Sequence, residues 1–228
     1  MDYKKKYTLL LLGLFFVSMV HSQFASVGEQ YNRFDSTIKT FDHSKEPTDG
    51  SPYVFKEFNP AKISLLKEVC LVNFDAYSNK MEIDKQGRIY CLPTNNFNYD
   101  IHFINSKKTY QLFNYEVNKE MKPGFFLVLI KNNKRYLLKK ERIRKFDAKK
   151  ATNGYNASRP ITFKRLKAIY YTCFENNKAL KIPSKKKHFL LLFNQQKDRI
   201  ATYMKQQKLN YKKEEDLLQI FKYYNRIN

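Results

Sequence analysis

Several residue types are scarce in this chain, and each scarcity narrows the chemistry open to the protein. Its 228 residues include six glycines, four histidines, three cysteines and no tryptophan. With so few glycines we expect no glycine-rich loop for holding phosphate groups, and no such spacing occurs. HExxH, GxSxG and CxxC motifs are also missing from the sequence. The sequence therefore does not indicate zinc-protease, serine-hydrolase, zinc-ribbon or thioredoxin-like sites.

The remaining candidates for catalysis are weak. His43 lies among acidic residues, where a solvated loop is the simpler interpretation, and His188 follows three lysines, which favours the surface. His102 shares one face of a predicted strand with Asp100, but no nucleophile is evident beside this pair. Nothing around Cys173 supports a thiol site. We therefore predict no catalytic residue, no metal site and no cofactor, and an exported enzyme is the least supported function.

Acidic residues are few relative to basic ones. The chain has 43 Lys and Arg against 21 Asp and Glu, a net charge of +22. Removal of residues 1–22, which hold three lysines and one aspartate, would leave +20. Such a charge favours anionic partners and resists self-association. Charge alone gives salt-sensitive and non-specific binding, so a specific nucleic-acid partner is not indicated.

The first 22 residues have the layout of a signal peptide. A basic cluster, Lys4–Lys6, precedes the apolar run 7–20, and the small residue Ser22 would be the cleavage point before Gln23. The alternative is a membrane anchor, but the run is shorter than the roughly 20 apolar residues that a spanning helix needs. We predict an exported protein, periplasmic or extracellular, without a transmembrane segment after cleavage.

Beyond the signal peptide the chain divides into three parts. Residues 23–60 are polar and rich in turn residues and predict an extended N-terminal arm. Residues 61–183 alternate short apolar runs with turns, which indicates an antiparallel β domain, a meander forming a sandwich or a partial barrel. The predicted strands are 63–66, 69–77, 80–84, 88–92, 99–104, 109–113, 125–130, 135–146, 161–174 and 179–182.

Residues 184–228 change to a helical pattern. Ser184 is a candidate N-cap, and helical turns are expected over 188–193 and 198–208. In the last segment the apolar residues fall at helical spacing, and three carboxylates stand in its first turn, where they suit the helix dipole. We predict a helical hairpin packed on the β domain, an α+β fold overall. The apolar face comprises Leu217, Ile220, Phe221 and Tyr224.

The three cysteines lie in apolar runs that are predicted to be strands. Cys70 and Cys91 could pair as a disulfide across neighbouring strands if the protein is exported. The alternative, which we favour, is three buried apolar thiols that include Cys173.

The most basic stretch, residues 131–150, holds ten cations against two carboxylates. In a strand, Lys139 and Lys140 point to opposite faces, and Arg142 and Arg144 share the face of Lys140. One interpretation is an edge strand that charge protects from aggregation. The other is a surface that binds a polyanion. Its predicted members are Arg135, Lys139, Lys140, Arg142, Arg144, Lys145, Lys185, Lys186 and Lys187.

Several segments together resemble small exported proteins of unknown function from flavobacteria and related Bacteroidota. They are the signal peptide ending before Gln23, the arm at 50–53, the hairpin at 73–82, the basic strand at 139–146, and the segments 212–217 and 223–225. The resemblance implies export and brings no activity. The leading hypothesis is a non-catalytic envelope protein that binds an anionic envelope component. The alternative is an adaptor that binds another envelope protein through its C-terminal helices.

Overall fold

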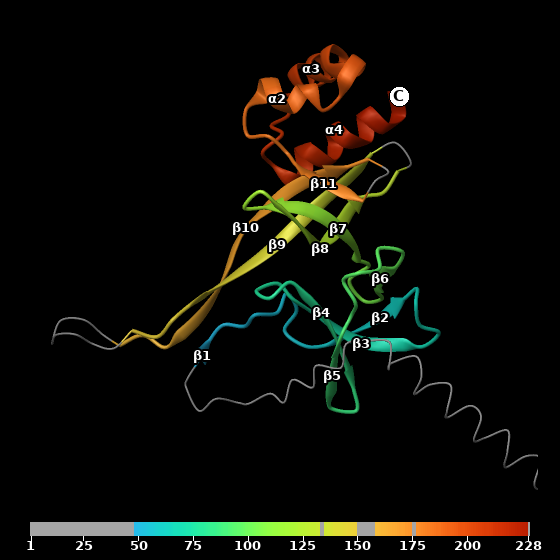
Figure 1. The fold of residues 1–228 in the computed structure, drawn as a ribbon. Helices are drawn as coiled ribbons and strands as arrows, with labels where there is room; N and C mark the ends of the chain where they lie inside the picture. Colours follow the sequence, from blue (N-terminus) through green and yellow to red (C-terminus); the bar gives the residue numbers. More distant parts are fainter. Residues whose placement is uncertain (1–47, 133–134, 150–157, 175–176, 228) are drawn as a thin grey trace, which may run out of the picture.

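The computed structural model describes residues 48–132, 135–149, 158–174 and 177–227. It consists of one large, mostly antiparallel sheet of eleven strands with the C-terminal helices packed on it, which confirms the predicted fold class (Figure 1). The strands are β1 Thr48–Asp49, β2 Asn59–Ile63, β3 Val69–Asp75, β4 Lys80–Lys85, β5 Arg88–Cys91, β6 Asp100–Phe103, β7 Thr109–Val117, β8 Glu120–Ile130, β9 Tyr136–Phe146, β10 Ile161–Cys173 and β11 Lys178–Lys181.

The strand order is β1-β10-β9-β8-β7-β6-β2-β3-β4-β5. Most neighbours in space are neighbours in sequence, as in a meander, because short turns join antiparallel strands. Two pairings depart from this pattern. Strand β2 lies antiparallel between β3 and β6, and the short β1 pairs parallel to the start of β10 through Thr48–Ile161 and Asp49–Thr162.

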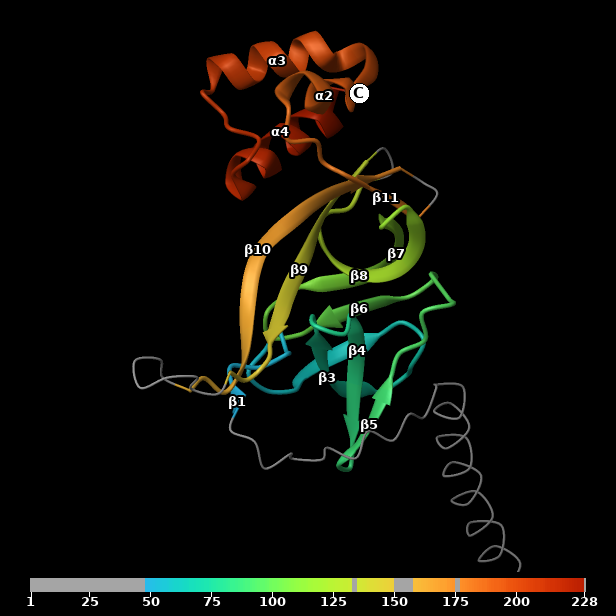
Figure 2. The same cartoon turned by 60° about the vertical axis from the view of Figure 1, so that its left-hand side comes forward.

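Strand β11 closes part of the sheet on itself. It pairs antiparallel with β10, at Tyr171–Lys181, and parallel with β7, at Lys178–Asn114. Strands β7, β8, β9, β10 and β11 therefore form a closed ring, the strand ring, in the upper half of Figure 2. Its interior takes at least one apolar side chain from each strand: Phe113, Phe126, Leu138, Tyr171 and Ala179.

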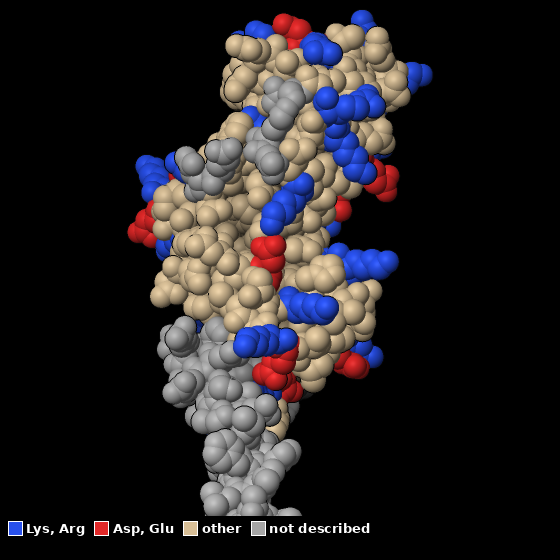
Figure 3. Space-filling view, turned by 90° about the vertical axis from the view of Figure 1, so that its right-hand side faces the viewer, with Lys and Arg blue, Asp and Glu red and all other residues tan. Residues whose placement is uncertain are grey.

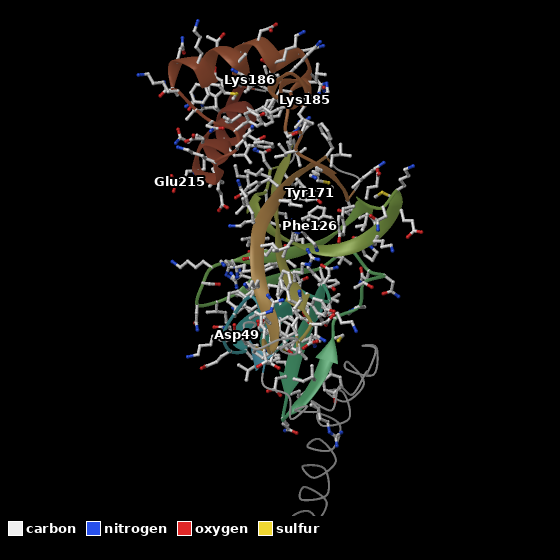
Figure 4. All side chains as sticks on the ribbon, turned by 90° about the vertical axis from the view of Figure 1, so that its left-hand side faces the viewer. Asp49, Phe126, Tyr171, Lys185, Lys186 and Glu215 are labelled. Carbon is white, nitrogen blue, oxygen red and sulfur yellow. The ribbon has the colours of Figure 1, made fainter. Side chains whose placement is uncertain are left out.

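The interior of the strand ring is largely aromatic. Phe126 and Tyr171 lie inside it (Figure 4), with ring centroids 5.0 Å apart and planes at 76°. Tyr115 meets Phe126 edge to face at 5.3 Å. Such edge-to-face pairs stabilise a core beyond the area that they bury, so a ring of five strands is filled by side chains.

A second core lies between β2–β6 and the outer face of the ring strands. Alternation along β7 and β8 sends one set of side chains into the ring and the other set, which includes Tyr110 and Phe125, into this second core. Tyr110 and Phe125 are both fully buried and contact the ring of Phe74. The same strands thus serve two cores.

The C-terminal helices cover one end of the strand ring (Figures 1 and 2). They are α2 Lys186–Leu191, the 3₁₀ turn η1 Asn194–Gln196, α3 Lys197–Gln206 and α4 Glu214–Ile227, which together we call the helical cap. The predicted apolar face of α4 is buried in a third core, which also contains Leu137 of β9. The predicted helical periodicity of α4 is therefore confirmed.

Several predicted boundaries are wrong. The first strand after the arm is β2 at Asn59–Ile63, and the predicted run 63–66 is mostly a turn. Strand β8 begins at Glu120, because the hairpin turn is Asn118–Lys119, both with positive φ as in a type I′ turn. The N-cap of α2 is Lys185, without a side-chain cap, and the Ser184 carbonyl instead accepts a hydrogen bond from the Tyr211 hydroxyl.

The end of the predicted arm lies against the body. The Tyr53 hydroxyl donates to Glu82 at 2.7 Å, the Phe55 ring lies 4.6 Å from the Phe103 ring, and Tyr53 forms a β-bridge with Asp75. The predicted signal peptide and the predicted arm up to residue 47 lie outside the described residues. Within the described residues no helix is long and apolar enough to cross a lipid bilayer.

The three cysteines are buried thiols. Strand β4 lies between β3, which holds Cys70, and β5, which holds Cys91. The premise of the predicted disulfide, that these two cysteines stand on neighbouring strands, is therefore wrong.

Candidate anion-binding surface

Two of the nine predicted polyanion ligands are inside the protein. Arg135 has no exposed surface and Lys140 is 6% exposed. Neither side chain can contact a polymer at the surface, so the prediction that these two residues bind a polyanion is wrong. The alternation of the strand correctly predicted that Lys140 shares a face with Arg142 and Arg144. At Lys140 this face lies inside the strand ring, and farther along β9 it lies outside the ring.

Lys140 lies among aromatic rings and main-chain groups. Its Nζ is 4.8 Å from the Phe126 centroid and 4.9 Å from that of Tyr115, and it donates to the Phe125 carbonyl at 3.0 Å and to Asn79 Oδ1. Burial lowers the pKa of Lys140 to about 7. The ammonium is thus a structural group at the mouth of the ring.

Gly124 makes room for this ammonium group. A Cβ at residue 124 would lie 2.8 Å from Lys140 Nζ and 2.6 Å from Tyr115 Cε1, closer than such atoms can approach. The glycine is therefore required by the close approach of two side chains across the ring.

Lys139 points to the other face of β9 and contacts the helical cap. Its Nζ lies 2.6 Å from Glu214 Oε2 at the start of α4, and the Tyr170 hydroxyl donates to the same oxygen at 2.6 Å. Burial raises the pKa of Glu214, but the hydrogen bonds from Lys139 and Tyr170 outweigh it and leave the pKa below its ordinary value. Lys139 therefore holds the cap on the sheet and is not available to a polymer.

Arg142, Arg144 and Lys145 lie where β9 and β10 leave the body. Pairing of β9 with β8 extends only from Leu137 to Lys139, and in the described residues β9 continues beyond this point paired with β10 alone. We call residues 142–149 and 158–167 the distal ribbon. It holds eight cationic side chains against one carboxylate, Asp147, a net charge of +7.

One face of the distal ribbon combines cations with an aromatic ring. Arg144 stands directly opposite Lys164, and both lie over the Phe146 ring, at 5.0 and 6.0 Å from its centroid. Arg142, two residues before Arg144, is on the same face. The opposite face carries Ile143 and its neighbours, which pack against the second core. On the cationic face Arg144 and Lys164 are exposed and Arg142 is half-buried.

Sequence reasoning missed half of this surface. Lys164, Arg165 and Lys167 belong to β10, which pairs with β9, but they occur in the run 161–174, which was predicted only as a strand. Arg165 is partly engaged, since it donates to the Val54 carbonyl at 2.6 Å and lies 3.9 Å from Glu141. The sequence did contain a signal for these residues, because a second basic strand follows the first after a turn-rich loop.

Lys185, Lys186 and Lys187 form a separate basic group. They are exposed at the start of α2. The distal ribbon lies at the opposite end of the molecule, where Figure 4 labels Asp49 of β1, the strand that pairs with it. The structure therefore does not bring these lysines together with Arg142 and Arg144. On the face shown in Figure 3, acidic and basic side chains are mixed.

Among the described residues, the weak catalytic candidates are not joined into a catalytic arrangement. His102 is exposed with Nδ1 3.0 Å from Thr109 Oγ1, while Asp100 contacts Lys131 at 3.1 Å and Gln111. Burial raises the pKa of Cys173 to about 11, which opposes thiolate formation. His43 lies outside the described residues. Among those described, no three His, Cys, Asp or Glu side chains gather as metal ligands.

Comparison with known proteins gives no match at any level. No family model matches the chain, no curated protein is significantly similar in sequence, and no solved structure matches its fold. The function is therefore argued from the site itself.

Proposed function

We propose that this chain is an exported, non-catalytic protein of the cell envelope whose distal ribbon binds an anionic polymer. The observation that supports it best is the outward face of Arg142, Arg144 and Lys164 around Phe146. Among the described residues these cations have no carboxylate within 4 Å. Like charges directly opposite on a sheet are destabilising, so an anionic partner would relieve the repulsion between Arg144 and Lys164.

The aromatic ring adds to the argument. Phe146 is half-buried beneath two cations, an arrangement that suits a ligand with both charge and flat apolar surface, as in an acidic glycan. The signal-peptide pattern of residues 1–22 supports export, so the available polymers would be envelope phosphates and acidic glycans. The competing interpretation is protection of an open strand edge by charge, which predicts aggregation and no loss of binding when the cations are removed.

The adaptor hypothesis has less support. The apolar face of α4 is fully used by the third core, since Leu217, Ile220 and Phe221 have no exposed surface. A partner protein would have to bind the polar outer side of the helical cap.

The test compares two triple variants of the chain beginning at Gln23, each losing three positive charges. The ribbon variant is R142Q/R144Q/K164Q, and the matched control is K185Q/K186Q/K187Q at the opposite end. Binding to lipopolysaccharide and to heparin resin is measured as a function of salt. We expect the ribbon variant to reduce the slope of log K against log salt by about 2–3, following the contribution of each lost phosphate or sulfate contact, and the control to change it much less.

Equal losses in both variants would show that binding follows net charge alone and would overturn the proposal. Lys139 and Lys140 are left unchanged, because one is paired with Glu214 and the other is buried. Unfolding of the ribbon variant would be seen by circular dichroism and is not expected from three exposed or half-exposed positions.

A further inference from the structure

Arg135 is a buried cation without a polar partner among the described residues. It immediately precedes β9 and its Nε, Nη1 and Nη2 atoms are all inaccessible to solvent and without a hydrogen bond. Burial lowers the pKa of its guanidinium, which nevertheless stays charged near neutral pH. Buried charged groups in proteins are nearly always paired or hydrogen-bonded, since an unpaired one is costly. We therefore expect a counter-ion beside the guanidinium group of Arg135.

Three aromatic rings surround the guanidinium group. Its central carbon lies 3.9 Å from the Phe174 centroid, 5.2 Å from that of Tyr224 and 5.7 Å from that of Phe193. Contacts between a cation and a ring face engage the π system and supply no acceptor for the N–H groups. The five N–H donors lie in the guanidinium plane, where they match the two oxygens of a carboxylate or phosphate.

A second orphan polar atom lies close by. Asn225 of α4 donates its Nδ2 to the Arg135 carbonyl at 3.5 Å, and its Oδ1 is buried without a partner among the described residues. Arg135 offers only donors, and Asn225 Oδ1 accepts. A single ligand satisfies both if it carries an oxyanion and, beside it, a hydroxyl or N–H group.

The surrounding side chains come from several elements. Arg135 immediately precedes β9, Phe174 follows β10, and Tyr224 and Asn225 belong to α4. These donors and rings therefore come together only when the helical cap is seated on the strand ring. Phe174, whose ring lies closest to the guanidinium group, is 40% exposed and is therefore the least buried of the three aromatic residues.

We propose that Arg135 binds a small oxyanion, a carboxylate or a phosphate, at the seam between the strand ring and the helical cap. Binding there would stabilise the folded chain, because the unfolded chain lacks the site. This site is independent of the distal ribbon: it is buried, lies at the opposite end of β9 and takes a small molecule in place of a polymer.

The test measures thermal unfolding in sodium chloride, acetate, lactate and phosphate at matched ionic strength. We expect the oxyanions to raise Tm by about 2–4 °C relative to chloride, the size of a stabilisation of about 1 kcal/mol in a chain of this length. Lactate should raise Tm more than acetate does, because its hydroxyl can donate a hydrogen bond to Asn225. Comparing the rise in Tm with phosphate and with lactate distinguishes the two classes of oxyanion. The Arg135→Met variant should lose the rise.

The matched control is Arg199→Met, which removes an exposed arginine from α3 of the same cap. It should keep the full rise. An equal rise in the wild type and both variants would show general anion binding by a basic surface and would overturn the proposal, as would no rise in the wild type. If Arg135→Met does not fold, ¹⁵N spectra of the wild-type arginine Nε–H groups replace it. One buried Nε–H signal should then shift on adding phosphate, and no shift overturns the proposal.

Glu175 is a carboxylate of the chain itself that would compete with an external oxyanion. Glu175 follows Phe174 in the sequence and lies outside the described residues. If Glu175→Gln lowers Tm in chloride, and Arg135→Met abolishes that effect in the double variant, the counter-ion belongs to the chain and the proposed site is overturned. If Glu175→Gln leaves the oxyanion-dependent rise intact, the site is supported.

Discussion

Strand β9 carries cations in two settings, and the contrast between them shows what a basic strand can mean. At its inner end, Lys140 and Arg135, the residue just before the strand, are buried among aromatic rings. At its outer end, Arg142 is half-buried and Arg144 is exposed. The same spacing of lysines and arginines thus serves the core at one end and the surface at the other, and the change occurs where β9 separates from β8.

The largest expected effect comes from reversing charge in the two settings. In Lys140→Glu a carboxylate would face the Phe125 carbonyl and Asn79 Oδ1 inside the ring, so we expect a loss of about 3–5 kcal/mol of unfolding free energy. Arg144→Glu changes an exposed residue of the same strand, and we expect a change within about 0.5 kcal/mol. Urea denaturation measures both. Similar losses in the two variants would remove the distinction between inner and outer cations.

A smaller effect is the dependence of stability on pH. The folded-state pKa of Lys140 is about 7, below the ordinary lysine value near 10.5, so between these values the unfolded chain binds more protons. Stability should therefore rise as pH increases from about 7 to about 10.5 and be independent of this group below about 7. In Lys140→Met this rise should be absent. The difference between wild type and variant, taken at each pH by urea denaturation, isolates the lysine, and a constant difference would contradict the assignment.

Lys139 lies between the two settings, since it is half-exposed and paired with Glu214. Breaking this ion pair should have the smallest effect on the free energy of unfolding. Glu214→Gln should cost at most about 1 kcal/mol, the range of partly exposed ion pairs. Because the folded-state pKa of Glu214 is depressed, its contribution is present above the unfolded pKa and disappears as pH falls through the folded one. The control is Glu215→Gln, an exposed neighbour. If both variants lose the same stability between neutral and acidic pH, the Lys139 contact does not secure the cap.

Local patterns predicted most elements of this fold. Met81 and Ile83 alternate with polar residues and form β4, and the spacing of Leu217, Ile220 and Phe221 predicted α4. The pattern of α4 succeeds because it reflects one buried face of one element, whereas in β4 the polar face also contains a buried residue, Glu82.

Non-local contacts account for what the sequence did not predict. The pairing of β11 with β7 joins segments far apart in the chain, and nothing in the residues of either strand specifies it. Alternation placed Lys140 and Arg142 on one face correctly, but only the ring decides that Lys140 is inside. Similarly, Lys164 became part of the candidate site through its cross-strand neighbour Arg144.

The strand ring is closed by the pairing of β11 with β10 and β7, a short contact that we call the β11 seam. Strand β11 contributes two residue pairs to β10 and two to β7, whereas β9 and β10 share ten. Closing the seam joins residues about 60 positions apart, and contacts at such separation have a high loop-closure entropy. The seam is therefore expected to form late in folding and to open first in local fluctuations. Opening there would loosen the aromatic packing inside the ring while leaving the β9–β10 pairing and the distal ribbon in place.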